Sequence, residues 1–260
     1  MKKTPGNPTP KVLLSAVRRA LVQAGDAGDA AFLQRFFRTG PGEYGEGDRF
    51  RGIRVPVLRS LSRRFAALPL SAVRRLLASR YHEDRLLALL LLVRRFERSG
   101  SDVRQQVVRL YLAHTAWINN WDLVDLSAPN ILGNWLLERD DPAALLPLAA
   151  SALLWERRIA MVACFSFIRA DRCAVACAVA ERLLDDPHDL IHKATGWMLR
   201  EVGKRDESAL RAFLDQHTPH MPRTALRYAL ERQTPAVRSH YLALPRTVTG
   251  TATRKRQRGS

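Results

Sequence analysis

The stretch from Asn119 to Leu126 holds the residues of this chain whose types and spacing best suit chemistry. Trp121 and Asp125 are four residues apart, so a helix here would place the indole and the carboxylate on one face. A carboxylate fixed beside an aromatic face can stabilise a positive charge that develops close to it. A plainer interpretation is that Asp122 and Asp125 are solvated acids in the first turn of a helix, with Trp121 packed on a neighbouring helix.

A second candidate lies at the start of an apolar segment, where Arg157 and Arg158 follow Trp155. The two guanidinium groups could contact phosphates, because their planar donors match the oxygens of a phosphate group. Arginines are also common at the boundary of an amphipathic helix, where their stems cover apolar surface and no ligand is needed. The pattern leaves both roles open.

Two further stretches carry basic residues at helical spacing. Lys193, Trp197 and Arg200 are spaced to share one helix face. Gly196 lies inside this predicted helix, where it costs about 1 kcal/mol relative to Ala, so we expect a neighbouring backbone to approach it closely. Arg223 begins a basic helix start that could hold a phosphate.

The charge of the chain indicates a polyanionic partner. Its formal net charge is +17, of which five charges lie in the acid-free tail 246–260, so +12 remains on the rest. An excess spread over the folded part favours nucleic acid. An arginine-rich coding bias of the source organism is the alternative explanation. An acidic membrane surface is a third, although no basic amphipathic helix with a large aromatic face supports it.

Composition and periodicity predict an all-α fold. Hydrophobic residues make up 47% of the chain and aromatic residues only 7%, which is typical of a helical protein. Apolar residues recur with helical period over 10–24, 30–38, from 55, from 69, and over 82–98, 102–118, 121–138, 141–152, 155–169, 173–184, 188–202, 208–216, 223–232 and 236–242. The helices pair at a spacing of roughly 30 to 40 residues, as in tandem helical repeats. We therefore predict an α-solenoid of about six antiparallel helix pairs with a concave basic face.

A glycine-rich loop interrupts this pattern at 39–48. Gly40, Gly42 and Gly45 match G-x-G-x-x-G, but a dinucleotide site needs a preceding strand, and here a helix precedes the loop. Glu43 and Glu46 would also repel a pyrophosphate. The stretch is expected to be an ordered loop with several residues at positive φ.

Metal and cofactor chemistry are not supported. His188 and His192 have the i, i+4 spacing of metal ligands but lack a third ligand nearby. Cys173 and Cys177 share that spacing and are expected to be buried thiols. G-x-S-x-G, a Walker loop and H-E-x-x-H do not occur in the sequence. We predict neither a metal nor a cofactor.

The chain is expected to be a cytoplasmic protein, in the bacterial cytosol or nucleoid. Three cysteines without a framework spacing indicate a reducing compartment. No signal peptide is evident, and the longest apolar run, 86–93, is too short to span a bilayer. The predicted organisation is a flexible N-terminus (1–9), one helical-repeat domain (10–244) and a disordered basic tail (245–260). One such solenoid could act as a monomer.

Three motifs resemble one protein family. They are W-D-x-V-D at Trp121–Asp125, W-x-x-R at Trp155–Arg158 and K-A-x-G-W-x-L-R-E at Lys193–Glu201. In this order and spacing they are similar to the AlkD-like DNA alkylation repair glycosylases with HEAT-like repeats. The resemblance covers about residues 10–235 and is carried by the two tryptophan-containing motifs together.

The resemblance implies a set of functional residues. The catalytic aspartate would be Asp125, the tryptophans beside the lesion Trp121 and Trp197, and the phosphate-contacting arginine Arg158, with an aromatic residue near Phe36. The wider DNA-binding set that we predict is Arg158, Arg157, Lys193, Arg200, Arg223 and Phe36. The chain departs from the family at Asn120, where some members carry an aromatic residue, and in the glycine-rich loop.

The expected activity is hydrolysis of the N-glycosidic bond of cationic alkylpurines, such as 7-methylguanine and 3-methyladenine, in duplex DNA. Breaking this bond moves positive charge onto the sugar, and Asp125 could stabilise that charge and position a water. The family leaves the lesion in the base stack, so no deep base pocket is expected. A non-catalytic solenoid that binds bent or branched DNA is the alternative, and a HEAT-type protein scaffold is a third possibility.

Overall fold

A computed structural model describes residues 13–245, and every regular element in that range is a helix. The only strand-like pairing there is an isolated bridge between Arg49 and Tyr81. The predicted all-α class is confirmed. The predicted flexible N-terminus (1–9) and nearly all of the predicted tail (245–260) lie outside the described residues.

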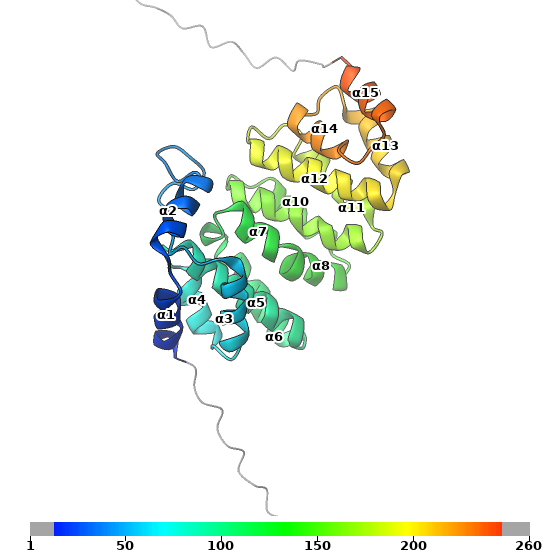
Figure 1. Cartoon of the computed structure of the whole chain (residues 1–260). Helices are drawn as coiled ribbons and strands as arrows, with labels where there is room; N and C mark the ends of the chain where they lie inside the picture. Colours follow the sequence, from blue (N-terminus) through cyan, green and yellow to red (C-terminus); the bar gives the residue numbers. More distant parts are fainter. Residues whose placement is uncertain (1–12, 246–260) are drawn as a thin grey trace, which may run out of the picture.

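The helices follow one another as a stacked array, coloured in chain order from α1 to α15 (Figure 1). Their bounds are α1 Leu14–Gln23, α2 Ala27–Phe36, α3 Val55–Arg64, α4 Leu70–Leu77, α5 His82–Arg98, α6 Ser101–Leu112, α7 Trp121–Ser127, α8 Asn134–Glu138, α9 Leu145–Ala149, α10 Leu154–Arg169, α11 Cys173–Arg182, α12 Asp189–Arg205, α13 Glu207–His217, α14 Arg223–Ala229 and α15 Pro235–Ala243. Short turns of 3-10 or π type are η1 Thr115–Trp117, η2 Pro129–Gly133 and η3 Pro142–Ala144.

Three long helices connect the layers of the array. α5 packs against α3, α4, α6 and α7, α10 against α7, α9, α11 and α12, and α12 against α10, α13 and α14. Each long helix thus contacts elements close to it in the chain, as in a solenoid. α5 is apolar around most of its circumference, with a continuous buried run from 86 to 92. A helix of this kind is stable only when neighbours cover it on several sides.

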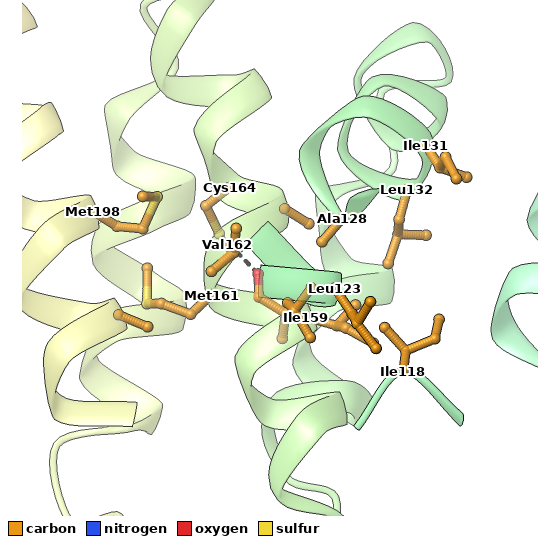
Figure 2. Packing of buried hydrophobic residues seen from close by; sticks show 14 of the residues in the cluster. Ile118, Leu123, Ala128, Ile131, Leu132, Ile159, Met161, Val162, Cys164 and Met198 are labelled. Atoms are coloured by element: carbon orange, nitrogen blue, oxygen red, sulfur yellow. Dashed lines mark hydrogen bonds between the residues drawn. The ribbon is translucent and has the colours of Figure 1, made fainter. Parts of the chain in front are cut away.

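The core is continuous through the middle of the array. Figure 2 shows Met161 of α10 facing Met198 of α12, while Leu123 of α7 and Ile118 lie on the other side of Ile159. All five side chains are fully buried. Each contributes roughly 1.5–3 kcal/mol through the apolar surface that it removes from water. This packing fixes α7, α10 and α12 relative to one another.

The helix predicted over 121–138 is interrupted. Pro129 has no N–H to donate, and a wide π turn follows in which the Gly133 N–H donates to the carbonyl of Ala128, with an N–O distance of 2.9 Å. The carbonyl of Pro129 also accepts a hydrogen bond from the Ser166 hydroxyl of α10 at 2.8 Å. The predictions over 102–118 and 141–152 were also too long, because α6 ends at Leu112 and α9 spans only Leu145–Ala149.

The close approach expected at Gly196 is confirmed. A Cβ atom built on Gly196 would meet the carbonyl oxygen of Ala225 and would lie 2.5 Å from the Cβ atom of Tyr228. Both neighbours belong to α14. Because Gly196 has no side chain, α12 and α14 can cross in close contact at this position.

We predict that Gly196→Ala destabilises the fold. Helix propensity alone would favour Ala by about 1 kcal/mol, but the clash with the α14 backbone should outweigh this and lower the free energy of unfolding by about 2 kcal/mol. Urea unfolding followed by circular dichroism measures the change. Gly100→Ala is the control, since its methyl group would meet no atom within 4 Å and should change stability by no more than about 1 kcal/mol. Equal effects of the two substitutions would contradict this account.

Candidate active site

A hollow of about 450 Å³ opens between the two ends of the array. Figure 1 shows α2 with its following loop on one side of the array and α12 and α14 on the other, and residues of all these elements line the hollow. Its lining residues come from α2, the loop after it, α7, α10, α12 and its N-cap, and α14. They are Phe36, Arg38, Tyr44, Trp121, Asp125, Arg158, His188, Asp189, Leu190, Lys193, Trp197, Arg200 and Tyr228. Seven of the nine predicted site residues are among them.

Asp125 and Arg158 form the centre of the site. The carboxylate oxygens of Asp125 accept two parallel hydrogen bonds from Arg158, at 2.9 Å from Nε and 2.8 Å from Nη2. The third guanidinium nitrogen donates to the carbonyl of Leu190 at 2.6 Å. Such a bidentate pair fixes the orientation of both planar groups. The Arg158 side chain is only 6% exposed, whereas that of Asp125 is 20% exposed and faces the hollow.

The electrostatic environment of Asp125 combines two opposing effects. Burial raises the pKa of its carboxyl group, and the positive charge of Arg158 opposes that rise. The two charge-assisted hydrogen bonds from Arg158 require an ionised carboxylate. Asp125 is therefore a partly buried carboxylate with a fixed direction, and the interpretation as a freely solvated acid is wrong.

The two tryptophans of the hollow are held by other aromatic rings. Trp121 packs against Phe36 and Phe37, with ring centroids 6.2 and 5.5 Å away. Trp197 packs against Phe165 at 6.2 Å. Both indoles are half-buried and line the hollow together with Asp125. The sequence prediction that Trp121 and Asp125 share a helix face holds in the structure.

The predicted face of Lys193, Trp197 and Arg200 also lines the hollow. Lys193 is paired with Asp189, with an Nζ–Oδ2 distance of 2.8 Å. Arg200 is paired with Glu231 and lies 3.6 Å from Glu201.

Arg157 and Arg223 do not reach the hollow. Arg157 pairs with Asp186 at 2.5 Å and donates to backbone carbonyls before α10. Arg223 donates to the carbonyl of Leu242 in α15 at 3.0 Å. The sequence around Arg157 and Arg223 did not indicate these partners, because the partners belong to other parts of the array. The structure therefore separates both from the other predicted DNA contacts.

The sequence prediction missed Tyr44, Arg38 and Tyr228, which also line the hollow. Tyr44 lies in the glycine-rich loop, and its ring meets Trp155 edge-on with centroids 6.1 Å apart. Gly42 and Gly47 have positive φ, as expected for the loop. The sequence signal that could have identified Tyr44 and Arg38 was the cluster of glycines beside them, because such a cluster indicates a loop with a defined shape.

A buried polar cluster lies beneath the N-terminus of α7. His82 donates to or accepts from Asp122 at 2.8 Å through Nε2, and its Nδ1 lies 3.6 Å from Asp48. Asp48 accepts hydrogen bonds from Arg85 at 2.7 Å and from Asn119 at 3.0 Å. The cluster thus joins the end of the glycine-rich loop, the start of α5 and the start of α7.

Two residues of this cluster, His82 and Asp48, have shifted pKa values. Burial disfavours the charged form of His82, but the negative charge of Asp122, the hydrogen bond to Asp122 and the nearby carboxylate of Asp48 raise its pKa to about 9. Burial likewise opposes ionisation of Asp48, and contacts with His82, Arg85 and Asn119 lower its pKa. Asp122 is therefore the acceptor of a buried ion pair rather than a solvated first-turn acid.

Asn120 completes the start of α7. Its side chain is fully buried, and its Oδ1 atom accepts the N–H of Trp121 at 2.8 Å as the N-cap of the helix. A capping amide at this position offsets an unpaired donor of the first turn.

The histidines and cysteines have structural positions. His188 caps α12 by accepting the N–H of Leu190, and His192 contacts the carbonyl of Asp186. Cys164, Cys173 and Cys177 are free thiols. Cys164 and Cys173 are buried, whereas Cys177 is only half-buried, so the expectation of a buried thiol is wrong for Cys177. Within residues 13–245 no three potential ligands gather in a metal-binding group.

A family model described as "DNA alkylation repair enzyme" matches residues 17–232. The chain belongs to this family. A solved structure titled "Predicted DNA alkylation repair enzyme from Enterococcus faecalis" is similar, with a TM-score of 0.65 and 16% sequence identity over 81% of this chain and 97% of that chain. At this identity it shows the shared all-α fold. No curated protein matches the sequence.

Membership of a DNA alkylation repair family confirms the resemblance drawn from the three motifs and supports a role in DNA repair. It also accounts for the basic charge of the chain, since DNA is a polyanion. A search of residues 13–245 for a helix long and apolar enough to cross a membrane finds none.

We predict that His82 makes stability depend on pH. Its folded pKa of about 9 lies above the ordinary value of 6.5, so its stabilising contribution is complete below pH 6.5 and is lost as pH rises through 9. At 1.36 kcal/mol per pKa unit the contribution is roughly 3 kcal/mol. His82→Gln should therefore be less stable than wild type at pH 6 and should show a flatter profile up to pH 9.

Urea unfolding at a series of pH values tests this. His240→Gln, which removes an exposed histidine from α15, is the control and should follow the wild-type profile. If His82→Gln retains the wild-type pH dependence, the buried ion pair does not form.

Proposed function

We propose that the protein is a DNA glycosylase that hydrolyses the N-glycosidic bond of cationic alkylated purines, such as 7-methylguanine and 3-methyladenine, in duplex DNA. The observation that carries this proposal is the position of Asp125 in one hollow with Trp121 and Trp197. A repair role follows from the family, and this arrangement supports the particular reaction.

The chemistry of the lesion explains why a carboxylate could catalyse the reaction without a second group that protonates the leaving base. A purine alkylated at N3 or N7 is already positively charged, so it leaves as a neutral base with the electron pair of the broken bond. The sugar then carries positive charge at C1′, as in other glycoside cleavages. A water adds to C1′ and gives up a proton. Asp125 can stabilise the charged sugar and accept that proton.

Arg158 would act on this step through Asp125. Its two parallel hydrogen bonds hold the carboxylate in one direction, and its charge favours the ionised form that the reaction needs. A carboxylate that is oriented before the reaction loses little free energy to reorganisation during it.

The tryptophans would act on the sugar. Each indole presents a face on which a deoxyribose can pack, and the negative face of an aromatic ring attracts a developing cation. The rings that flank Trp121 and Trp197 limit their movement. The positively charged sugar and the negatively charged carboxylate of Asp125 would then lie in a site that is partly shielded from water. Electrostatic attraction is stronger there than in bulk water.

The shape of the hollow favours a lesion that stays in the base stack. The hollow is shared by elements from both ends of the array, and its walls are formed by rings and charged groups rather than by a closed base pocket. A single copy of the chain contains every residue of this site, so a monomer could act on duplex DNA in the cytosol. The proposal needs no metal or cofactor.

Asp125→Asn is the decisive variant. The substitution keeps the size of the side chain and removes its charge, so release of 7-methylguanine from methylated duplex DNA should fall by about 100-fold or more, as for other residues that stabilise transition-state charge. DNA affinity should hold or rise, because a negative charge near the phosphates is lost. Quantifying released bases by chromatography, with affinity measured in parallel, tests both expectations.

Glu138→Gln is a control for loss of one negative charge, since Glu138 pairs with Arg104 on the surface away from the hollow. It should retain activity. Absence of base release by the wild type would overturn the glycosylase proposal and would leave a DNA-binding solenoid as the leading explanation. A loss of folding in Asp125→Asn as large as its loss of activity would assign Asp125 a structural role.

A further inference from the structure

We propose that Arg38, which directly precedes the glycine-rich loop, is the arginine that contacts a DNA phosphate at this site, and that Arg158 is a positioning residue for Asp125. The inference rests on the proposed function for the location of the DNA, and it reassigns the phosphate contact that the sequence predicted for Arg158.

The ion pairs of the hollow separate its cations into two groups. Arg158, Lys193 and Arg200 each pair with a carboxylate of the same protein. Arg38 lines the hollow too, yet within residues 13–245 its side chain has no ion pair and no hydrogen bond. A cation whose donors all remain open has the most to gain from an incoming phosphate.

Each of the three guanidinium nitrogens of Arg158 already donates a hydrogen bond within the protein. Nε and Nη2 donate to Asp125, Nη1 donates to the carbonyl of Leu190, and the side chain is only 6% exposed. Turning this guanidinium toward a phosphate would break the pair and leave Asp125 partly buried without its partner, which is costly. Arg158 is better placed to hold Asp125 than to bind DNA.

Backbone geometry presents Arg38 to the hollow. Its φ is +50°, a left-handed conformation that is uncommon for a residue with a side chain and that is often found at functional sites. The carbonyl of Arg38 accepts the N–H of Gly45 at 3.1 Å. Only a glycine fits at Gly45, because a Cβ atom there would lie 2.7 Å from the carbonyl oxygen of Phe37.

The acids of the loop are turned onto its own backbone. Glu43 accepts the N–H of Gly40 at 2.8 Å, and Glu46 accepts that of Gly42 at 2.9 Å. Neither glutamate lines the hollow. These bonds stiffen the loop and keep both carboxylates away from the path of a phosphate.

The loop is also fixed relative to the catalytic helix. Asp48, at its end, is buried and accepts hydrogen bonds from Arg85 of α5 and from Asn119, which directly precedes the N-cap of α7. The same anchor therefore sets the position of Arg38 and that of Asp125. A phosphate held by Arg38 would bring the backbone of the lesion strand to a defined place beside the carboxylate.

Salt-dependent DNA binding tests the assignment. The affinity of the full chain for an unmodified duplex is measured by fluorescence anisotropy at several salt concentrations, for wild type, Arg38→Gln, Arg38→Lys, Arg158→Gln and Arg35→Gln. Arg38→Gln should bind several-fold more weakly, and the slope of log affinity against log salt should become shallower by about 0.9, the value for one lost phosphate contact. Arg38→Lys keeps the charge and should restore the slope.

Arg35→Gln is the matched control, since Arg35 is an exposed arginine of α2 that does not line the hollow. Its slope should equal that of the wild type, as should the slope of Arg158→Gln. A shallower slope for Arg158→Gln together with a wild-type slope for Arg38→Gln would overturn the assignment. So would equal effects of Arg38→Gln and Arg35→Gln.

Because binding is measured on unmodified DNA, this result is independent of glycosylase activity. A shallower salt dependence of DNA affinity in Arg38→Gln, without any base release by the wild type, would support the phosphate contact and contradict the proposed reaction. If Arg158→Gln fails to fold, the comparison of Arg38→Gln with Arg35→Gln still decides whether Arg38 contacts a DNA phosphate.

Discussion

Burial of charge is the constraint on which the rest of this structure depends. Four consecutive residues at the start of α5, His82 to Arg85, are almost completely buried. A buried charge without a partner is strongly unfavourable, so each of them needs a partner from elsewhere in the chain. Glu83 accepts three backbone N–H groups of residues 51–53, Asp84 pairs with Arg51, and His82 and Arg85 meet at Asp48. The partners that these four buried side chains require thus fix the positions of the glycine-rich loop, the segment that follows it and the start of α7.

The same constraint shapes the site itself. A buried ion pair adds little net stability, because the loss of hydration offsets most of the attraction, but it does impose one geometry. Between Asp125 and Arg158 that geometry has a use in the proposed reaction. The carboxylate is held in one direction and is partly open to the hollow, while its partner is enclosed between α10 and the first turn of α12. The two hydrogen bonds therefore define the direction of the carboxylate that the proposed reaction would use.

The array explains why residues so distant in sequence can share one hollow. Phe36 and Tyr228 line the same space although they lie near opposite ends of the domain. Each helix pair contacts chiefly its neighbours, so the array keeps an open side instead of closing into a compact core. An open side suits an extended polyanion that is held through its backbone. The close crossing at Gly196 contributes to this shape, since it determines how near α14 lies to α12.

The sequence by itself determined the helical class, the family and the central residues of the site. Helical periodicity is a local property, and Trp121, Asp125, Lys193 and Trp197 are paired within single helices, so their spacing was enough to place them on common faces. Only the tertiary structure decided which charges are available. Arg157 and Arg158 are adjacent in the chain, yet one pairs with Asp186 and the other with Asp125, and neither partner could be inferred from local pattern. The position of the glycine-rich loop was also decided there, because Asp48 is held by residues that are 37 and 71 positions away in the sequence. Ion pairs between repeats depend on how the helices stack, and stacking is a property of the whole array.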